Sequence, residues 1–214
     1  MARILSVISI FLLSSCDPST LTKILNQPLT IAEITSGLNE ALSKGSKSAS
    51  NALSVTDGFY RSAYKILLPD EARVVTDKLK IIPGFGNVEE IILEKINRAA
   101  EDAAKNAAPI FIAAIKEMTI QDAMGILKGE KDAATRYLER TTYQALYNEF
   151  QPIVLHSLDT FKAVDYWEDA VDKYNKIPFI QKVNPRIDDH VATKALKALF
   201  DLVEKKEYKI RTDI

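Results

Sequence analysis

Apolar side chains recur at intervals of three or four residues along most of this chain, which is the spacing of one face of an α-helix. No segment shows the strict alternation of a half-buried strand. The pattern therefore predicts an all-α fold, an irregular bundle of about seven to nine helices around a central alanine-rich helix. The predicted helices span 30–56, 69–82, 89–118, 119–128, 131–150, 152–161, 163–177 and 188–206.

Polar residues mark where several of these helices begin. Thr30 followed by Glu33 has the spacing of a capping box, in which each side chain bonds the backbone N–H of the other residue. Thr119 resembles an N-cap, and either Asp188 or Asp189 is placed to cap the last helix. These residues fix the expected starts of three helices.

Small residues shape the first helix of the bundle. Ala41, Gly45 and Ala49 lie one turn apart and would let another helix approach closely. A run rich in serine and lysine surrounds Gly45, but the small-residue period continues through it. We therefore expect one helix that continues until Asp57-Gly58 breaks it.

Two prolines interrupt helical segments. Proline lacks an N–H and clashes with the preceding turn, so Pro109 is expected to kink or split the alanine-rich segment near residues 107–108. Pro152 is expected to mark a kink or the start of a new helix. Residues 207–214 are expected to form a tail, docked through Tyr208 and Ile210.

The first sixteen residues follow a different pattern. Arg3 precedes an apolar run from Ile4 to Leu13, which as a helix would rise about 15 Å, too short for a bilayer core of about 30 Å. A basic start, a short apolar run and small residues are typical of an export signal. The sequence Leu13-Ser14-Ser15-Cys16 resembles the bacterial lipobox, which implies that Cys16 carries a diacylglycerol thioether and becomes the first mature residue.

This interpretation divides the chain into a signal peptide at 1–15, a tether at 16–28 and a helical domain at 29–214. Cys16 is the only cysteine, so no disulfide can form within the chain. We expect a periplasm-facing lipoprotein of the bacterial cell envelope, bound to a membrane through its N-terminal lipid. The lipid can attach the protein to either the inner or the outer membrane.

Composition excludes some partners. The chain has a net charge of −1 at neutral pH, which argues against a nucleic-acid groove. No later apolar run approaches the length of a membrane span. The sequence predicts no cofactor, no nucleic-acid partner and no second membrane segment.

Residues that bind metals or catalyse reactions are scarce. His156 and His190 are the only histidines, and no metal-site spacing supplies further ligands. His190 is expected to cap or to be solvated, and His156 to have a polar neighbour and no catalytic role. The acidic side chains at 165, 168, 169 and 172 lie on one helical side, which is typical of a solvated face. No metal site and no catalytic residue is therefore predicted.

One group of polar residues is a candidate functional pocket, because polar side chains set among alanines must find a partner or form a site. Its alternative, which we favour, is a buried structural hydrogen-bond network. The candidate residues are Glu101, Asp102, Asp132, Thr135 and Arg136.

Several blocks resemble a bacterial family of unknown function, DUF4197. They run in order from Asn97–Ala103 through Ile126–Gly129 and Asp132–Thr135 to Thr193–Leu196, within a likeness that covers roughly 38–211. The resemblance implies an exported helical protein, usually a lipoprotein. It brings no established catalytic residue.

The sequence thus favours a non-catalytic binding or structural module tethered to a membrane, with an envelope protein or a small envelope ligand as its partner. Two alternatives stay open: a carboxylate-dependent, hydrolase-like enzyme using Glu101, and a carrier of an apolar small ligand.

Overall fold

A computed structural model describes residues 30–81, 83–84, 86–160, 163–180, 182 and 187–212. Within these ranges the protein has eight α-helices and no strand, which confirms the all-α prediction. The predicted signal peptide, the tether and Cys16 lie outside the described residues. The helices are α2 (Ile31–Ser54), α3 (Asp70–Leu79), α4 (Val88–Ala104), α5 (Ala107–Lys116), α6 (Ile120–Lys128), α7 (Ala133–Thr160), α8 (Ala163–Asn175) and α9 (Asp188–Thr212).

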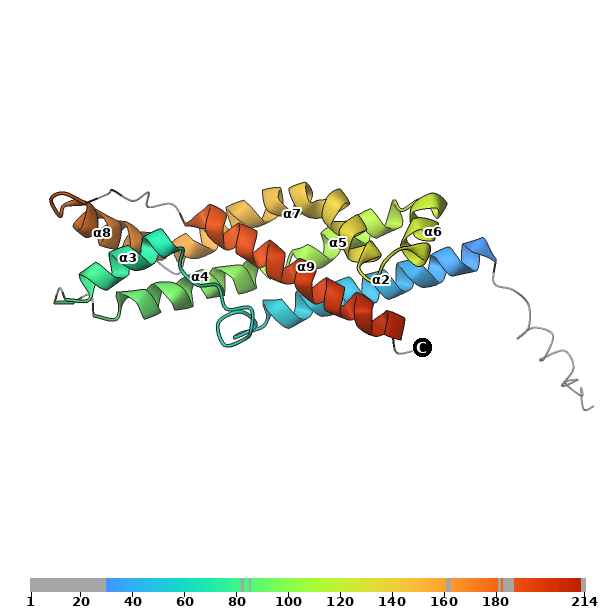
Figure 1. The fold of residues 1–214 in the computed structure, drawn as a ribbon, viewed down its shortest axis with the longest axis horizontal. Coiled ribbons are helices and arrows are strands. Elements are labelled where there is room, and N and C mark those ends of the chain that lie inside the picture. The colour runs from blue at the N-terminus through green and yellow to red at the C-terminus, as the bar shows by residue number, and fades with distance from the viewer. Residues whose placement is uncertain are drawn as a thin grey trace, which may run out of the picture.

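The helices form an elongated bundle (Figure 1). Helices α2, α4, α5, α7 and α9 run along its length, while α3 and α8 lie at one end and α6 lies at the other. The first residues of α2 and the last residues of α9 share the end that carries α6. The predicted tether would therefore join the bundle at the α6 end.

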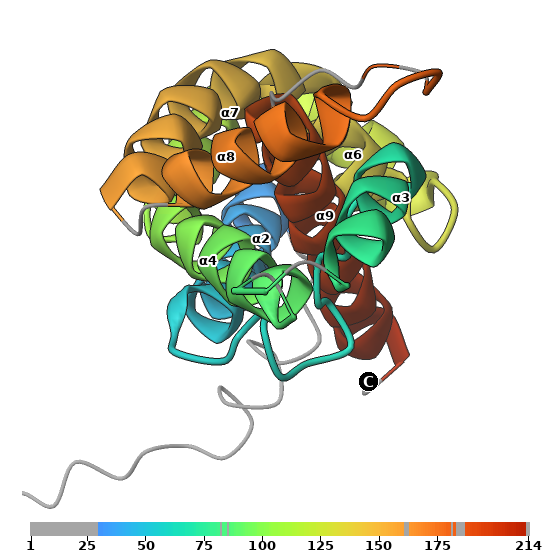
Figure 2. The ribbon, with the colours of Figure 1, turned by 90° about the vertical axis from the view of Figure 1, so that its left-hand side faces the viewer.

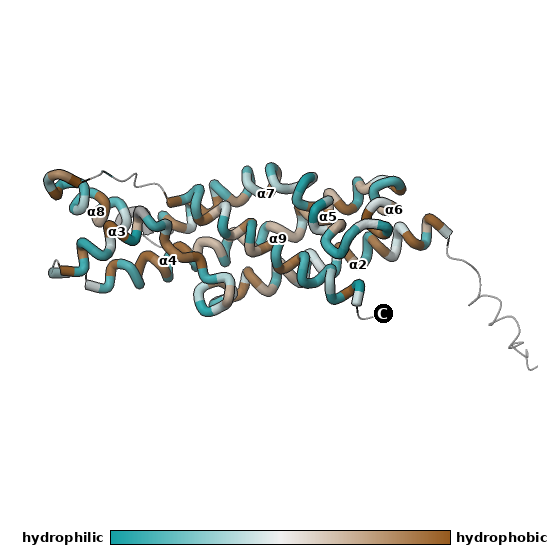
Figure 3. The backbone as a smooth tube through the Cα atoms, in the orientation of Figure 1, coloured by the Kyte–Doolittle hydropathy of each residue, from teal (hydrophilic) through white to brown (hydrophobic). Residues whose placement is uncertain are grey.

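The alanine-rich α4 lies at the centre of the packing, as predicted. It contacts α2, α3, α7, α8 and α9, and its alanines at 99, 100 and 103 are fully buried. Seen along the long axis, α4, α7 and α9 lie around the bundle axis (Figure 2), and α2 packs against α4, α5, α6 and α9. Hydrophilic and hydrophobic positions alternate along the long helices, as expected for amphipathic helices around one core (Figure 3).

Two predicted helix starts are confirmed in atomic detail. The Thr30 hydroxyl accepts a hydrogen bond from the Glu33 N–H, and the Glu33 carboxylate accepts one from the Thr30 N–H. Thr119 and Asp122 form the same reciprocal pair at the start of α6. The last helix differs slightly, because Asp188 is its first residue and so lies one position inside the expected cap.

The two prolines have different effects. The alanine-rich segment is split as predicted, with α4 ending at Ala104 and α5 beginning at Ala107. Pro109 lies in the first turn of α5, where a missing N–H costs nothing. Pro152 lies inside α7 and starts no new helix, because α7 continues unbroken to Thr160.

The predicted tail is wrong. Helix α9 continues to Thr212, and Glu207 is buried with only 5% of its surface exposed. Tyr208 and Ile210, which were expected to dock the tail, are 50% and 42% exposed. The buried Glu207 carboxylate accepts hydrogen bonds from backbone N–H groups at the start of α7. No local sequence pattern predicts this long-range contact.

A pair of glycine substitutions tests this packing. A Cβ at Gly45 would lie 3.7 Å from the Lys206 Cβ, an ordinary contact, whereas a Cβ at Gly58 would lie 2.6 Å from the Leu53 carbonyl oxygen. Gly45→Ala is expected to raise the free energy of unfolding by about 0.5–1 kcal/mol through helix propensity. Gly58→Ala is expected to lower it by about 1–3 kcal/mol through overpacking. Urea unfolding checks both, and equal effects of the two substitutions would contradict the packing described.

Candidate functional site

The segment between α2 and α3 is held against α4 by a buried asparagine. The Asn97 side chain is fully buried, and its Oδ1 accepts a hydrogen bond from the Ile66 N–H at 2.8 Å. Its Nδ2 donates to the Ile66 carbonyl at 2.9 Å and to the Leu93 carbonyl at 2.7 Å. Asn97 thus pairs the Ile66 backbone as a neighbouring strand would, and it fixes the extended chain that follows Tyr64.

One turn further along α4, Glu101 holds the beginning of the same segment. Its Oε1 accepts hydrogen bonds from the N–H groups of Phe59 and Tyr60, both at 3.2 Å. Its Oε2 accepts a 2.8 Å bond from Arg98, which also bonds Asp57 at 2.8 Å. These carboxylates raise the pKa of Arg98, Glu101 chiefly through its hydrogen bond, and so keep the guanidinium charged.

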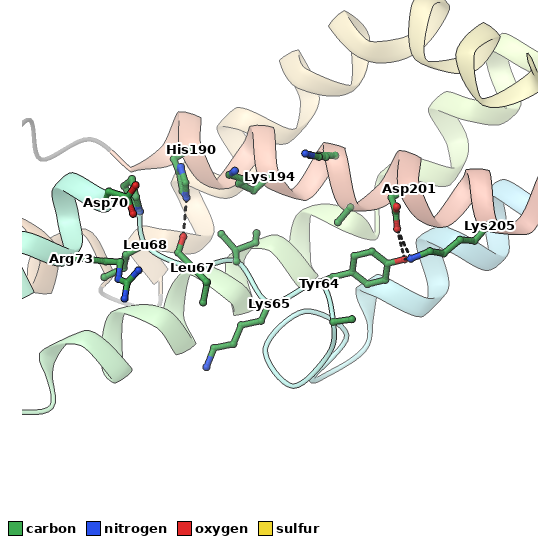
Figure 4. A pocket seen from close by; sticks show the side chains of 15 residues that line it. Tyr64, Lys65, Leu67, Leu68, Asp70, Arg73, His190, Lys194, Asp201 and Lys205 are labelled. Atoms are coloured by element: carbon green, nitrogen blue, oxygen red, sulfur yellow. Dashed lines mark hydrogen bonds and ion pairs between the residues drawn. The ribbon is translucent and has the colours of Figure 1, made fainter. Parts of the chain in front are cut away.

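The segment fixed in this way forms one wall of an open groove, and the exposed side of α9 forms the other (Figure 4). The groove encloses about 800 Å³. Spacings of three and four residues bring the groove-lining side chains of α9 to one face of the helix. These are His190, Lys194, Lys197, Ala198, Asp201 and Lys205.

A three-residue cluster joins the two walls at one end of the groove. The Tyr64 hydroxyl donates to Asp201 at 2.7 Å, and Lys205 Nζ donates to the Tyr64 oxygen at 3.0 Å and pairs with Asp201 at 2.7 Å. The hydrogen bond from Lys205 lowers the pKa of Asp201, and the same bond raises the pKa of Lys205. Burial raises the pKa of the Tyr64 phenol. The cluster therefore holds a charged lysine against a charged carboxylate and a neutral phenol.

His190 joins the walls at the other end. Its Nε2 lies 2.9 Å from the Leu67 carbonyl oxygen, and because a carbonyl only accepts, this nitrogen carries the proton. Figure 4 shows the two connections at opposite ends of the extended segment. His190 was expected to cap or to be solvated, and it instead connects α9 to the opposite wall.

The groove as a whole carries an excess of positive charge. Five cationic side chains line it, from Lys65, Arg73, Lys194, Lys197 and Lys205, against the two carboxylates of Asp70 and Asp201. Lys205 is paired, and Lys65 lies 4.5 Å from the centre of the Tyr60 ring. Arg73, Lys194 and Lys197 form no ion pair with any residue in the described part of the chain. The arrangement can therefore attract an anion.

The five residues of the predicted polar pocket do not share one pocket. Asp102 accepts a 2.6 Å bond from Ser157, which lowers its pKa together with Lys105. Thr135 instead bonds Glu207. Thr135 and Ser157 lie near opposite ends of α7, the longest helix, so the Asp102 and Thr135 contacts are far apart along the bundle.

The other three have separate partners. Asp132 and Arg136 form an ion pair at 2.9 Å, one turn apart and with the Arg136 side chain 57% exposed. Glu101 holds the segment before α3, as described above. Each of the five therefore has a structural partner, and the five fall into two groups, 101–102 in α4 and 132–136 at the start of α7.

The remaining candidate residues are not brought together into a site in the described part of the chain. No group of three or more His, Cys, Asp or Glu side chains in the described ranges is arranged to hold a metal ion. The acidic side chains at 168, 169 and 172 are exposed, and so is His156. Among the described helices, none combines the length and the apolarity that a membrane crossing requires.

The groove was not predicted from the sequence, although the pattern of polar residues on one of its walls is local. The spacing of His190, Lys194, Lys197, Asp201 and Lys205 places five polar side chains along one side of α9. Such a stripe is ordinary on a solvated helix face. Its neighbour, the segment at 63–70, is more than a hundred residues away in sequence, and only the fold shows that the two lie together.

Comparison with known proteins gives a family. No curated protein and no solved structure matches this chain. A family model described as a protein of unknown function, DUF4197, matches residues 28–214. The match extends beyond the likeness over 38–211 that the sequence blocks carry, and the chain belongs to the DUF4197 family.

Proposed function

We propose that this protein is a lipid-anchored, non-catalytic binding module of the bacterial cell envelope. In this proposal Cys16 attaches the chain to a membrane, residues 16–28 act as a tether, and the helical domain holds its ligand in the groove between residues 63–73 and α9. The observation that carries the proposal is the groove itself, which is open and preformed. Three of its cations have no ion-pair partner among the described residues.

The state of Glu101 favours binding over catalysis. A general base must reach a substrate with a free oxygen. Both oxygens of Glu101 accept hydrogen bonds, one from two backbone N–H groups and the other from Arg98. Glu101 is also only 5% exposed, so its carboxylate serves the fold and not a reaction.

The position of the groove is compatible with attachment at Cys16. The tether would join α2 at the end of the bundle that carries α6 and the last turn of α9 (Figure 1). The groove lies instead against residues 190–205 of α9 and the start of α3. A lipid at the N-terminus therefore leaves the groove accessible.

Cys16→Ser tests the attachment. The serine hydroxyl cannot form the thioether, so the variant is expected to keep residues 1–15, to migrate as a longer chain and to leave the lipoprotein fraction. Ser15→Ala is the matched control, because it keeps a small residue before the cysteine and should be processed normally. Fractionation and intact mass of both variants give the answer. Unchanged mass and unchanged membrane association of Cys16→Ser would refute the lipoprotein proposal.

A further inference from the structure

The groove differs in charge from the molecule around it. The chain has a net charge of −1, whereas the groove collects five cationic side chains against two carboxylates. Here Arg73, Lys194 and Lys197 have no ion-pair partner in the part of the chain that the structure describes. The described residues therefore leave a local excess of positive charge in the groove.

The cations come from opposite walls. Lys194 and Lys197 are three residues apart on α9, which makes them neighbours on the surface of that helix. Arg73 belongs to the first half of α3 and lies on the far side of the His190–Leu67 contact from Lys194 (Figure 4). Lys194 and Lys197 can share a single oxyanion, because each supplies N–H donors and positive charge.

Part of the remaining lining is apolar. Ile66 and Leu68 are buried at 2% and 4% exposure, and Ala198 lies beside them on α9. Leu67 between them is 58% exposed. The volume of the groove falls within the range of roughly 300–1,000 Å³ that is typical of sites for small organic molecules. Its lining thus suits a ligand with an anionic group and an apolar body.

We infer that the groove binds an organic phosphate, with its phosphoryl group against Lys194 and Lys197 and its apolar portion along Leu67 and Ala198. This deepens the proposed binding function and rests on it. The phosphoryl group can belong to a free small molecule or to the headgroup of a lipid in the membrane that holds the tether. The shared chemistry is a phosphate ester beside an apolar surface.

Calorimetric titration of the full chain in mild detergent tests the inference. Phenyl phosphate serves as the free probe, and vesicles containing phosphatidic acid, against vesicles of phosphatidylcholine alone, serve as the headgroup probe. We expect saturable binding of at least one phosphate probe. The double substitution Lys194→Gln and Lys197→Gln should weaken that binding tenfold or more. Both lysines are exposed, so the fold should not change.

A matched double substitution provides the control. Lys128→Gln and Lys209→Gln remove the same charge from exposed positions in the last turns of α6 and α9, outside the groove, and should leave the affinity unchanged. The inference is overturned if neither phosphate probe binds, if both double variants lose affinity equally, or if an acidic peptide such as oligoglutamate binds and the phosphates do not. Every groove residue lies beyond the predicted signal peptide and tether, which end at residue 28. Failure of the phosphate-binding test can therefore be distinguished from failure of the Cys16 test.

Discussion

Replacing Glu207 with alanine is expected to lower the free energy of unfolding by about 3–5 kcal/mol, because it removes a buried carboxylate that joins two backbone N–H groups and a half-buried arginine. The Glu207 carboxylate accepts hydrogen bonds from the Ala134 N–H at 3.0 Å and from the Thr135 N–H at 2.8 Å. It also pairs with Arg211 at 2.7 Å. The substitution leaves two N–H groups in the first turn of α7 and a half-buried guanidinium without their anion.

Urea unfolding at neutral pH measures this effect, and Arg211 supplies the comparison. Arg211→Ala alone should cost less, because Glu207 keeps its bonds to Ala134 and Thr135. The double variant should cost less than the sum of the two single variants, since the two residues share one network. A loss below about 0.5 kcal/mol for Glu207→Ala, the size of an ordinary surface change, would contradict this role.

The second large effect is expected for Asn97→Ala. Asn97 is fully buried and makes three hydrogen bonds, two of them to the backbone of Ile66. Without the amide, the Ile66 N–H and carbonyl lose their partners and a cavity opens beneath the segment, so stability should fall by about 2–4 kcal/mol. The wall of the groove should also lose its fixed position, and binding of the phosphate probe should weaken.

Ser50→Ala is the matched control for Asn97→Ala. The Ser50 hydroxyl is also buried and donates to the Ala104 carbonyl of α4 at 2.6 Å, away from the groove. Its loss should cost about 1 kcal/mol and leave the affinity for phenyl phosphate unchanged. Equal changes in affinity for the two variants would show that Asn97 acts through general stability alone, and would refute its role in positioning the groove wall.

Local signals predicted much of the fold because they act within a few residues. The pairs Thr30–Glu33 and Thr119–Asp122 satisfy N–H groups of their own helix, so their spacing in sequence is sufficient evidence. The split at Pro109 follows likewise from the geometry of proline. Pro152 has the same chemistry and yet lies inside α7, so tertiary packing decides whether a proline ends a helix or is absorbed.

Contacts between distant segments could not be predicted in the same way. Glu101, chosen from the sequence as a candidate functional residue, bonds the N–H groups of residues 59 and 60, about forty positions earlier. Glu207 belongs to a charged stretch that resembles a solvated tail, and its partners are 72 and 73 residues away. A polar residue in sequence can be exposed, structural or functional, and only its neighbours in space distinguish these roles.

The groove, too, could not be predicted from local sequence patterns. Lys194 and Lys197 are two of the 28 basic residues in the chain, and nothing local separates them from the others. They become a candidate site because the Asn97 and Glu101 contacts bring the segment at 63–70 alongside α9. The residues that build the site and those that would touch a ligand thus lie in segments far apart in the sequence, and the fold alone joins them.

We propose above all that this groove is a preformed phosphate-binding site. Backbone amide chemical-shift mapping tests it most directly, with phenyl phosphate titrated into the isotopically labelled full chain in detergent at constant ionic strength. We expect saturable shifts that cluster in residues 63–73 and 190–201, with the amides around Thr135 and Glu207 unmoved. Shifts spread evenly over the surface, or centred on the far end of the bundle near α6, would contradict it.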